Sequence, residues 1–224
     1  MRHQTPRYAP ATLRAPLRRN ADLSDLRFRQ LVPAADWDQL PRDVRIRFTK
    51  RLAGHQSAIY RGHVIETRFN LPGRILAQLL RVIGAPLPID RYADDSAAIV
   101  TVTEDPCSNG QFWSRQYNRR TGFPQVIHST KAFAGDTGLE EIVGAGIGMS
   151  LHLKVDGQHL TFVSHRYFLK LFGLRLKLPK LLEPGHLTVG HHDLGDGRFE
   201  FTLDLHHPLF GELVHQRAVF TDMT

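Results

Sequence analysis

The sequence is poor in cysteine and in long apolar runs, and each shortage excludes a class of protein. Cys107 is the only cysteine among 224 residues. No disulfide can therefore form within the chain, and no site can hold a metal through several thiolates. The longest apolar candidate, residues 71–87, is interrupted by Arg74, Gln78 and Arg81. Because a bilayer-spanning helix needs about 18 or more apolar residues, the sequence predicts no transmembrane segment.

What remains is the composition of a globular protein. Hydrophobic residues make up 42% and charged residues 23% of the chain, and both values are typical of folded domains. At roughly 150 residues per domain, the length predicts one large domain or two small ones, with a core that needs no disulfides. We expect a single β-rich domain over residues 31–224.

The positive charge is concentrated near the N-terminus. Lysine and arginine outnumber aspartate and glutamate by 29 to 22, but residues 1–30 alone contain seven arginines and only two aspartates. The rest of the chain is therefore close to neutral. This balance does not favour nucleic acid as a partner, because nucleic-acid-binding folds gather basic residues on one face.

Residues 1–30 also contain three prolines, and they lack the apolar run of a secretory signal. We interpret them as a disordered basic arm, with targeting or binding of a partner as the alternative role. Without a signal or a spanning helix, the expected compartment is the cytoplasm.

Two segments near the start of the domain have helical spacing. In residues 34–48, apolar side chains recur every three or four positions, and Pro41 suits the first turn of a helix. Residues 74–83 repeat the pattern, and Gly84 suits the end of this second helix. The apolar residues of the first segment are Trp37, Leu40, Val44 and Phe48.

Beyond residue 95 the apolar pattern alternates, as it does in half-exposed strands. Asp156-Gly157 is a hairpin turn signal, and residues 57–68 form a further predicted strand. Sequential hairpins imply antiparallel pairing, and a sheet with one apolar face must curl or be covered. The sequence therefore predicts an α+β, mostly β fold: a curved antiparallel sheet or partial barrel of about nine strands, with two N-terminal helical segments packed on it.

Residues 167–182 are an exception to this alternation. Phenylalanine and leucine fill nine of these sixteen positions. Two interpretations stay open: a strand followed by a short helix, or a lid over the open end of the sheet.

Most motifs with familiar chemistry stand in the wrong context. Residues 144–148 contain three alternating glycines, but a strand pattern follows them, whereas a dinucleotide site needs a helix there. The adjacent carboxylates Glu140 and Glu141 point to opposite faces of a strand, so they cannot act as a pair. His191, His192, His206, His207 and His215 lie in the last three strands, where we expect them to face solvent or lie in turns. We predict no metal site and no cofactor.

One strand has the pattern of a binding site. In residues 111–118, Trp113, Arg115 and Tyr117 occupy alternate positions and share one face. If this face is turned inward, Arg115 can bind an anionic head group while the aromatic rings line the walls. The alternative is a buried or edge ion pair between Arg115 and Glu141 that fixes the strand register. Trp113, Arg115, Tyr117 and Glu141 are the predicted ligand-binding residues.

Short motifs in a fixed order resemble a bacterial family, domain of unknown function 4166, over roughly residues 30–222. They are Trp37 with Leu40-Pro41, Tyr60-Arg61-Gly62, Trp113-Ser114-Arg115-Gln116-Tyr117, Glu141-Ile142-Val143-Gly144, Leu178-Pro179, and Pro208-Leu209-Phe210-Gly211-Glu212-Leu213-Val214. Members are often fused behind an NAD(P)-binding saccharopine-dehydrogenase-like or short-chain-dehydrogenase-like domain, which these 224 residues do not contain. The resemblance implies a separate dehydrogenase as partner. It transfers no catalytic residue, because the family has no established activity.

Three functional hypotheses follow, and whether the protein is an enzyme stays open. The first is binding of an apolar or amphipathic small molecule in a cavity of the curled sheet, with residues 167–182 as a lid. The second is an accessory or catalytic subunit that works with a dehydrogenase on a hydrophobic substrate, with Glu141 as the residue to test. The third is an interaction module whose basic arm binds an acidic protein or an anionic membrane.

Overall fold

The fold is that of a computed structural model, which describes residues 25–50, 52, 54, 56–90, 94–172 and 174–223. Within these residues, eleven strands form one antiparallel sheet, and helices are few. The strands are β1 (Ser57–Phe69), β2 (Ala97–Asp105), β3 (Gly110–Tyr117), β4 (Gln125–Ala132), β5 (Glu140–Gly144), β6 (Ile147–Asp156), β7 (His159–Leu171), β8 (Leu174–Lys177), β9 (His186–Gly195), β10 (Arg198–His207) and β11 (Gly211–Asp222).

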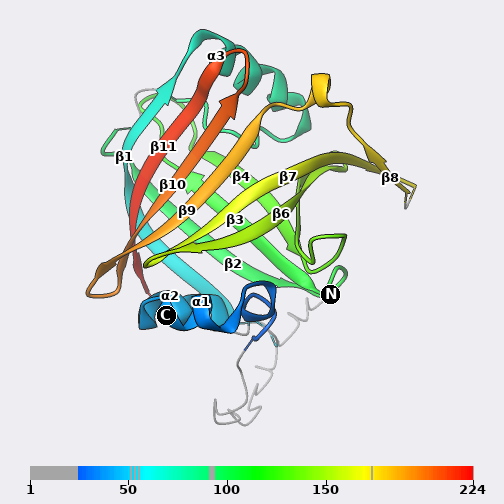
Figure 1. The fold of residues 1–224 in the computed structure, drawn as a ribbon. Helices are drawn as coiled ribbons and strands as arrows, with labels where there is room; N and C mark the ends of the chain where they lie inside the picture. Colours follow the sequence, from blue (N-terminus) through cyan, green and yellow to red (C-terminus); the bar gives the residue numbers. More distant parts are fainter. Residues whose placement is uncertain are drawn as a thin grey trace, which may run out of the picture.

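Ten of these strands close into a barrel, and β8 extends the sheet beside β7 (Figure 1). β1 pairs with β11, and β6 pairs with β7, which completes the ring. The predicted partial barrel of about nine strands is therefore corrected to a closed barrel of ten strands plus one. The difference arises because β7 continues beyond the residues whose apolar side chains alternate. Residues 159–163 pair with β9, whereas residues 168–171 pair with β8.

The apolar residues 167–182 contain the end of β7, all of β8 and the 3-10 helix η4 (Lys180–Leu182). All four residues of β8 are exposed, so this strand has no buried face and no alternation in burial. The interpretation as a strand followed by a short helix fits this segment better than a separate lid.

α1 (Ala34–Gln39) and α2 (Arg42–Thr49) cover one end of the barrel (Figure 1). They divide the predicted helical region at Pro41, which precedes the first residue of α2. The predicted apolar face is buried, since its four residues are each exposed by 3% or less. These residues are Trp37, Leu40, Val44 and Phe48.

α3 (Leu71–Leu79) and the 3-10 helix η3 (Leu80–Ile83) lie at the opposite end of the barrel (Figure 1). α3 begins at Leu71 because Asn70 caps it, its side-chain oxygen accepting from the N–H of Gly73 at 2.7 Å. Asn70 Nδ2 also donates to the carbonyl oxygen of Phe210 at 2.7 Å, which ties the helix to the barrel. No helix among the described residues is long and apolar enough to cross a membrane.

The aromatic core fills the half of the barrel nearest α1 and α2. Phe28 is 1% exposed, and its ring packs edge-on against Phe48 and Phe133 with centroids 5.4 and 4.8 Å apart. Residues 25–30, which the sequence placed in the basic arm, therefore pack on the barrel because Phe28 is buried there. The rest of the predicted arm, residues 1–24, lies outside the described residues.

Candidate ligand cavity

A cavity of about 690 Å³ occupies the half of the barrel under α3. This volume is within the range of roughly 300–1,000 Å³ that small-molecule sites have. Leu181 and Leu182 of η4 line the cavity and are 87% and 67% exposed, so the cavity reaches the surface beside η4. Most of the lining is apolar, and it includes Ile75, Leu76, Ile127, Met149, Leu187 and Phe201.

Glycines allow the helical wall of this cavity to lie close to the strands. A Cβ on Gly73 of α3 would lie 1.8 Å from the carbonyl oxygen of Leu213 on β11. A Cβ on Gly144 would lie 1.9 Å from the carbonyl oxygen of Ile83 in η3. The glycine-rich residues 144–148 thus support the cavity wall, and the predicted strand pattern after them is β6.

An ionic cluster of Arg115, Ser129, Lys131 and Glu141 lies at the inner end of the cavity. These side chains come from three neighbouring strands, β3, β4 and β5. Lys131 Nζ donates to Glu141 Oε2 at 2.7 Å, and Ser129 Oγ donates to Glu141 Oε1 at 2.5 Å. Arg115 is held less tightly: Nη1 donates to Ser129 Oγ at 3.1 Å, and Nη2 lies 3.4 Å from Glu141 Oε1.

The ionic cluster contains two cations and one anion, all buried. Arg115 is 8% exposed, Lys131 3% and Glu141 5%. Burial alone would raise the pKa of Glu141, but Lys131 and then Arg115 lower it to about 2. Glu141 is therefore ionised at neutral pH, and its closest cation is Lys131. Arg115 is the cation of this cluster that lines the cavity, and its guanidinium has five N–H donors.

The structure brings together three of the four predicted ligand-binding residues. Arg115, Tyr117 and Glu141 line the cavity, and burial raises the pKa of the Tyr117 phenol, which therefore stays neutral. Trp113 does not line the cavity; it lines an adjoining gap of about 10 Å³, which Arg115 and Tyr117 also line. Arg115 and Glu141 form the ion pair that the alternative interpretation described, and they also face the cavity.

Sequence reasoning missed two members of the ionic cluster, Ser129 and Lys131. They lie on the inward face of β4, and a polar face of a strand is normally assigned to solvent. Val126, on the outward face of the same strand, is 39% exposed, whereas Lys131 is 3% exposed. Lys131 could have been found from the charge of Glu141, because a buried carboxylate requires a cation nearby.

His191 lies in the aromatic core below the ionic cluster. Its ring is edge-on to Phe48 and stacked on Phe199, with centroids 4.9 and 5.8 Å apart. Burial, and then the cation of Arg47, lowers the pKa of His191 well below its ordinary value, so the ring is neutral. The prediction that histidines of the last strands face solvent is wrong for His191, because its position in β9 points inward among these rings.

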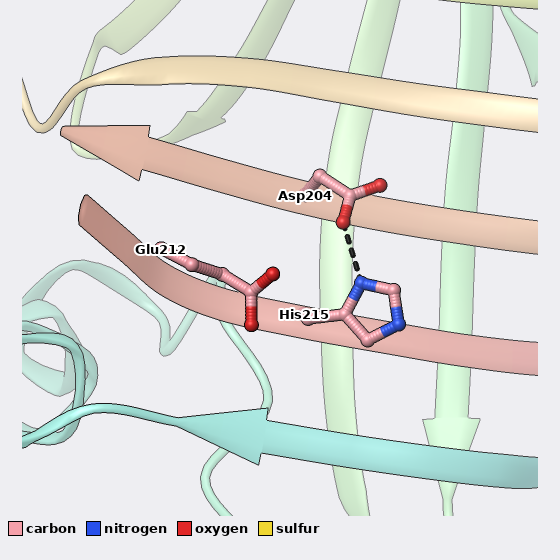
Figure 2. A group of neighbouring side chains, drawn as sticks. All are labelled: Asp204, Glu212 and His215. Carbon is pink, nitrogen blue, oxygen red and sulfur yellow. Dashed lines mark hydrogen bonds and ion pairs between the residues drawn. The ribbon is translucent and has the colours of Figure 1, made fainter. Parts of the chain in front are cut away.

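Three residues on the outside of the barrel come close enough together to hold a metal ion (Figure 2). One ligand atom from each of Asp204, Glu212 and His215 lies within 4.8 Å of the others, and no further such group occurs among the described residues. His215 Nδ1 lies 2.5 Å from Asp204 Oδ1, and Glu212 Oε1 lies 3.6 Å from Arg68 Nε. Each side chain therefore has a protein partner, and cross-strand pairing accounts for the arrangement.

A family model described as a domain of unknown function (DUF4166) matches residues 40–220, which is most of the chain. No curated protein and no solved structure matches the chain significantly. The matched region contains the barrel, α3 and the ionic cluster, whereas Trp37, one of the residues that carried the resemblance, precedes it. The chain belongs to the DUF4166 family.

Proposed function

We propose that the protein binds a small amphipathic molecule in the barrel cavity, with an apolar tail under α3 and an anionic head group at Arg115. The observation that supports this most is the position of Arg115 at the inner end of an apolar cavity. A buried cation is costly unless it is paired, and Glu141 is shared with Lys131. A ligand carboxylate would satisfy the guanidinium through two parallel hydrogen bonds.

The apolar lining supports a hydrocarbon tail as the larger part of the ligand. Burial of one CH₂ group contributes about 0.8 kcal/mol, so the tail would supply most of the affinity. The charged group would then fix the orientation of the bound molecule, because Arg115 is the only arginine or lysine among the described residues that line the cavity.

Glu141 offers little support for the enzymatic hypothesis. A carboxylate whose pKa is about 2 is a weak proton acceptor at neutral pH, and general bases work best when their pKa lies near the working pH. We therefore assign Glu141 to the positioning of Arg115 rather than to proton transfer.

Native mass spectrometry of the full chain with fatty acids, isoprenoids and sterols tests the proposal. We expect a bound molecule from this panel, and we expect I127W to abolish binding because Ile127 lines the cavity. V126W is the matched control, since Val126 is the neighbouring outward residue on β4 and does not line the cavity. Equal binding by both variants, or no binding by the wild type, would overturn the proposal.

Palmitate and 1-hexadecanol separate the role of the head group from that of the tail. Because a hydrogen bond to a charged group contributes about 1.5–3 kcal/mol, R115Q should weaken palmitate binding by about tenfold or more. Binding of the uncharged alcohol should change little. Equal losses for both ligands would contradict the placement of an anionic group at Arg115.

A further inference from the structure

The end of the barrel around the cavity carries the most exposed apolar side chains of the described residues. All nine large hydrophobic residues with an exposure of 64% or more lie on four segments, residues 71–88, 118–124, 170–184 and 208–210. The nine are Leu71, Leu79, Val82, Phe123, Phe172, Leu174, Leu181, Leu182 and Leu209. We call these four segments the cavity rim.

The topology places the four segments of the rim together. In an antiparallel barrel, every second connection lies at the same end, and the rim contains residues from the connections after β1, β3, β7 and β10. Residues from three of the segments line the cavity, among them Leu71, Leu181 and Phe210. The β7–β8 hairpin projects sideways from the barrel (Figure 1). Three of the four segments thus border the cavity, and the β7–β8 hairpin extends from one of them.

Basic residues are interleaved with these apolar side chains. The rim contains eight lysines and arginines and one acidic residue, Glu183. In the β7–β8 hairpin, for example, Lys170 and Lys177 flank Phe172, which is 94% exposed. Glu140 pairs with Arg175 at 2.8 Å, and Asp90, beside the rim, accepts a hydrogen bond from the backbone N–H of Arg120 at 3.3 Å. The rim therefore combines a wide apolar surface with a net positive charge.

We infer that the cavity rim docks on the surface of an anionic lipid bilayer. Monomeric proteins seldom expose large apolar patches unless the patch binds something. Protein interfaces are depleted in lysine, whereas interfacial membrane binding uses apolar side chains beside lysine and arginine. Each basic residue near an anionic leaflet contributes roughly 1 kcal/mol. In this orientation the cavity opens onto the lipid, so a ligand can pass between bilayer and barrel without crossing water.

Flotation of the full chain with vesicles tests this inference. We expect binding to vesicles of phosphatidylcholine mixed with phosphatidylglycerol, weaker binding at high salt, and little binding to phosphatidylcholine alone. F172S/K177E should reduce binding by about tenfold or more, because it removes an inserted ring and reverses one charge. Its matched control is L194S/R198E, which makes the same kind of change at the β9–β10 turn at the opposite end.

Both variants retain residues 1–24, so binding that depends on the basic arm would survive in both. Equal binding by F172S/K177E and the wild type, no preference for anionic lipid, or no binding by the wild type would overturn the inference. A dimer of the wild type and a monomer of F172S/K177E in light scattering would also overturn the inference, because the rim would then be a contact between two copies of the chain. Neither Phe172 nor Lys177 lines the cavity, so palmitate binding by F172S/K177E reports on the proposed function separately.

Discussion

Replacement of Glu141 by glutamine (E141Q) would leave two buried cations, Arg115 and Lys131, without their anion. A fall in the pKa of Glu141 from 4.5 to about 2 corresponds to about 3 kcal/mol, at about 1.4 kcal/mol for each pH unit. Removal of one partner of a buried ion pair costs about 3–5 kcal/mol in general. We therefore expect E141Q to lower the free energy of unfolding by about 3 kcal/mol, a large part of the roughly 5–15 kcal/mol of a typical domain.

Urea unfolding followed by tryptophan fluorescence measures this loss. Trp113 is a suitable reporter because its ring centroid lies 5.0 Å from Lys131 Nζ. E140Q is the matched control: Glu140 is as buried as its neighbour, but its partner Arg175 has a side chain that is 44% exposed. The cost of E140Q should therefore be smaller. The double variant K131M/E141Q removes the closest ion pair as a unit and should recover at least half of the loss.

The pH dependence gives an independent check with a definite sign. Because the pKa of Glu141 is lower in the folded than in the unfolded protein, its contribution is complete above about pH 4.5 and is lost as the pH falls toward 2. The difference in stability between the wild type and E141Q should shrink over this range. E141Q that is as stable as E140Q, or a difference in stability that is unchanged down to pH 3, would refute this role of Glu141.

Two further predictions concern the core and the helical wall. Since the pKa of His191 is lowered by burial, its contribution to stability is complete above about pH 6.5 and falls below it. Calorimetry should therefore show that the free energy of unfolding of H191L falls by about 1 kcal/mol less than that of the wild type between pH 6.5 and 5.5. H206L, at an exposed position, should behave like the wild type. G73A should lower stability in urea more than G157A does, although alanine normally stabilises a helix. At Gly73 a Cβ would lie 1.8 Å from a backbone oxygen, and at Gly157 no atom lies within 4 Å; equal costs would contradict this account of the wall.

The alternation of apolar residues was enough to predict most of the strands and to place Trp113, Arg115 and Tyr117 on one face of β3. Arg115 and Tyr117 lie on that face because side-chain direction follows from strand period alone. The strand period does not tell how far along the barrel axis a side chain lies. It therefore cannot show that Trp113 lines the small gap next to the cavity and not the cavity itself. The buried Lys131 was hidden for a related reason: its burial depends on a charge on another strand, not on its own neighbours in sequence.

Closure of the barrel could not be read from local patterns either. It depends on which strand lies beside β7, and β7 has β6 on one side and both β9 and β8 on the other. β8 is exposed at every position, so its sequence lacks the alternation by which a strand is recognised. The helical segments were predicted well because Pro41 and Gly84 act locally, within one turn of each helix end.

The pairing of β1 with β11 sets an order for the assembly of the barrel. Thr67 and Gln216 are partners although they stand 149 positions apart, whereas most other strands pair with a sequence neighbour through a short turn. Long-range pairing of this kind slows folding, because a large loop must close before the contact forms. A fragment that stops before Gly211 would leave β1 and β10 as two unpaired edges, which invite aggregation. Hairpins can therefore form early, but the cavity comes into existence only when the two distant strands meet.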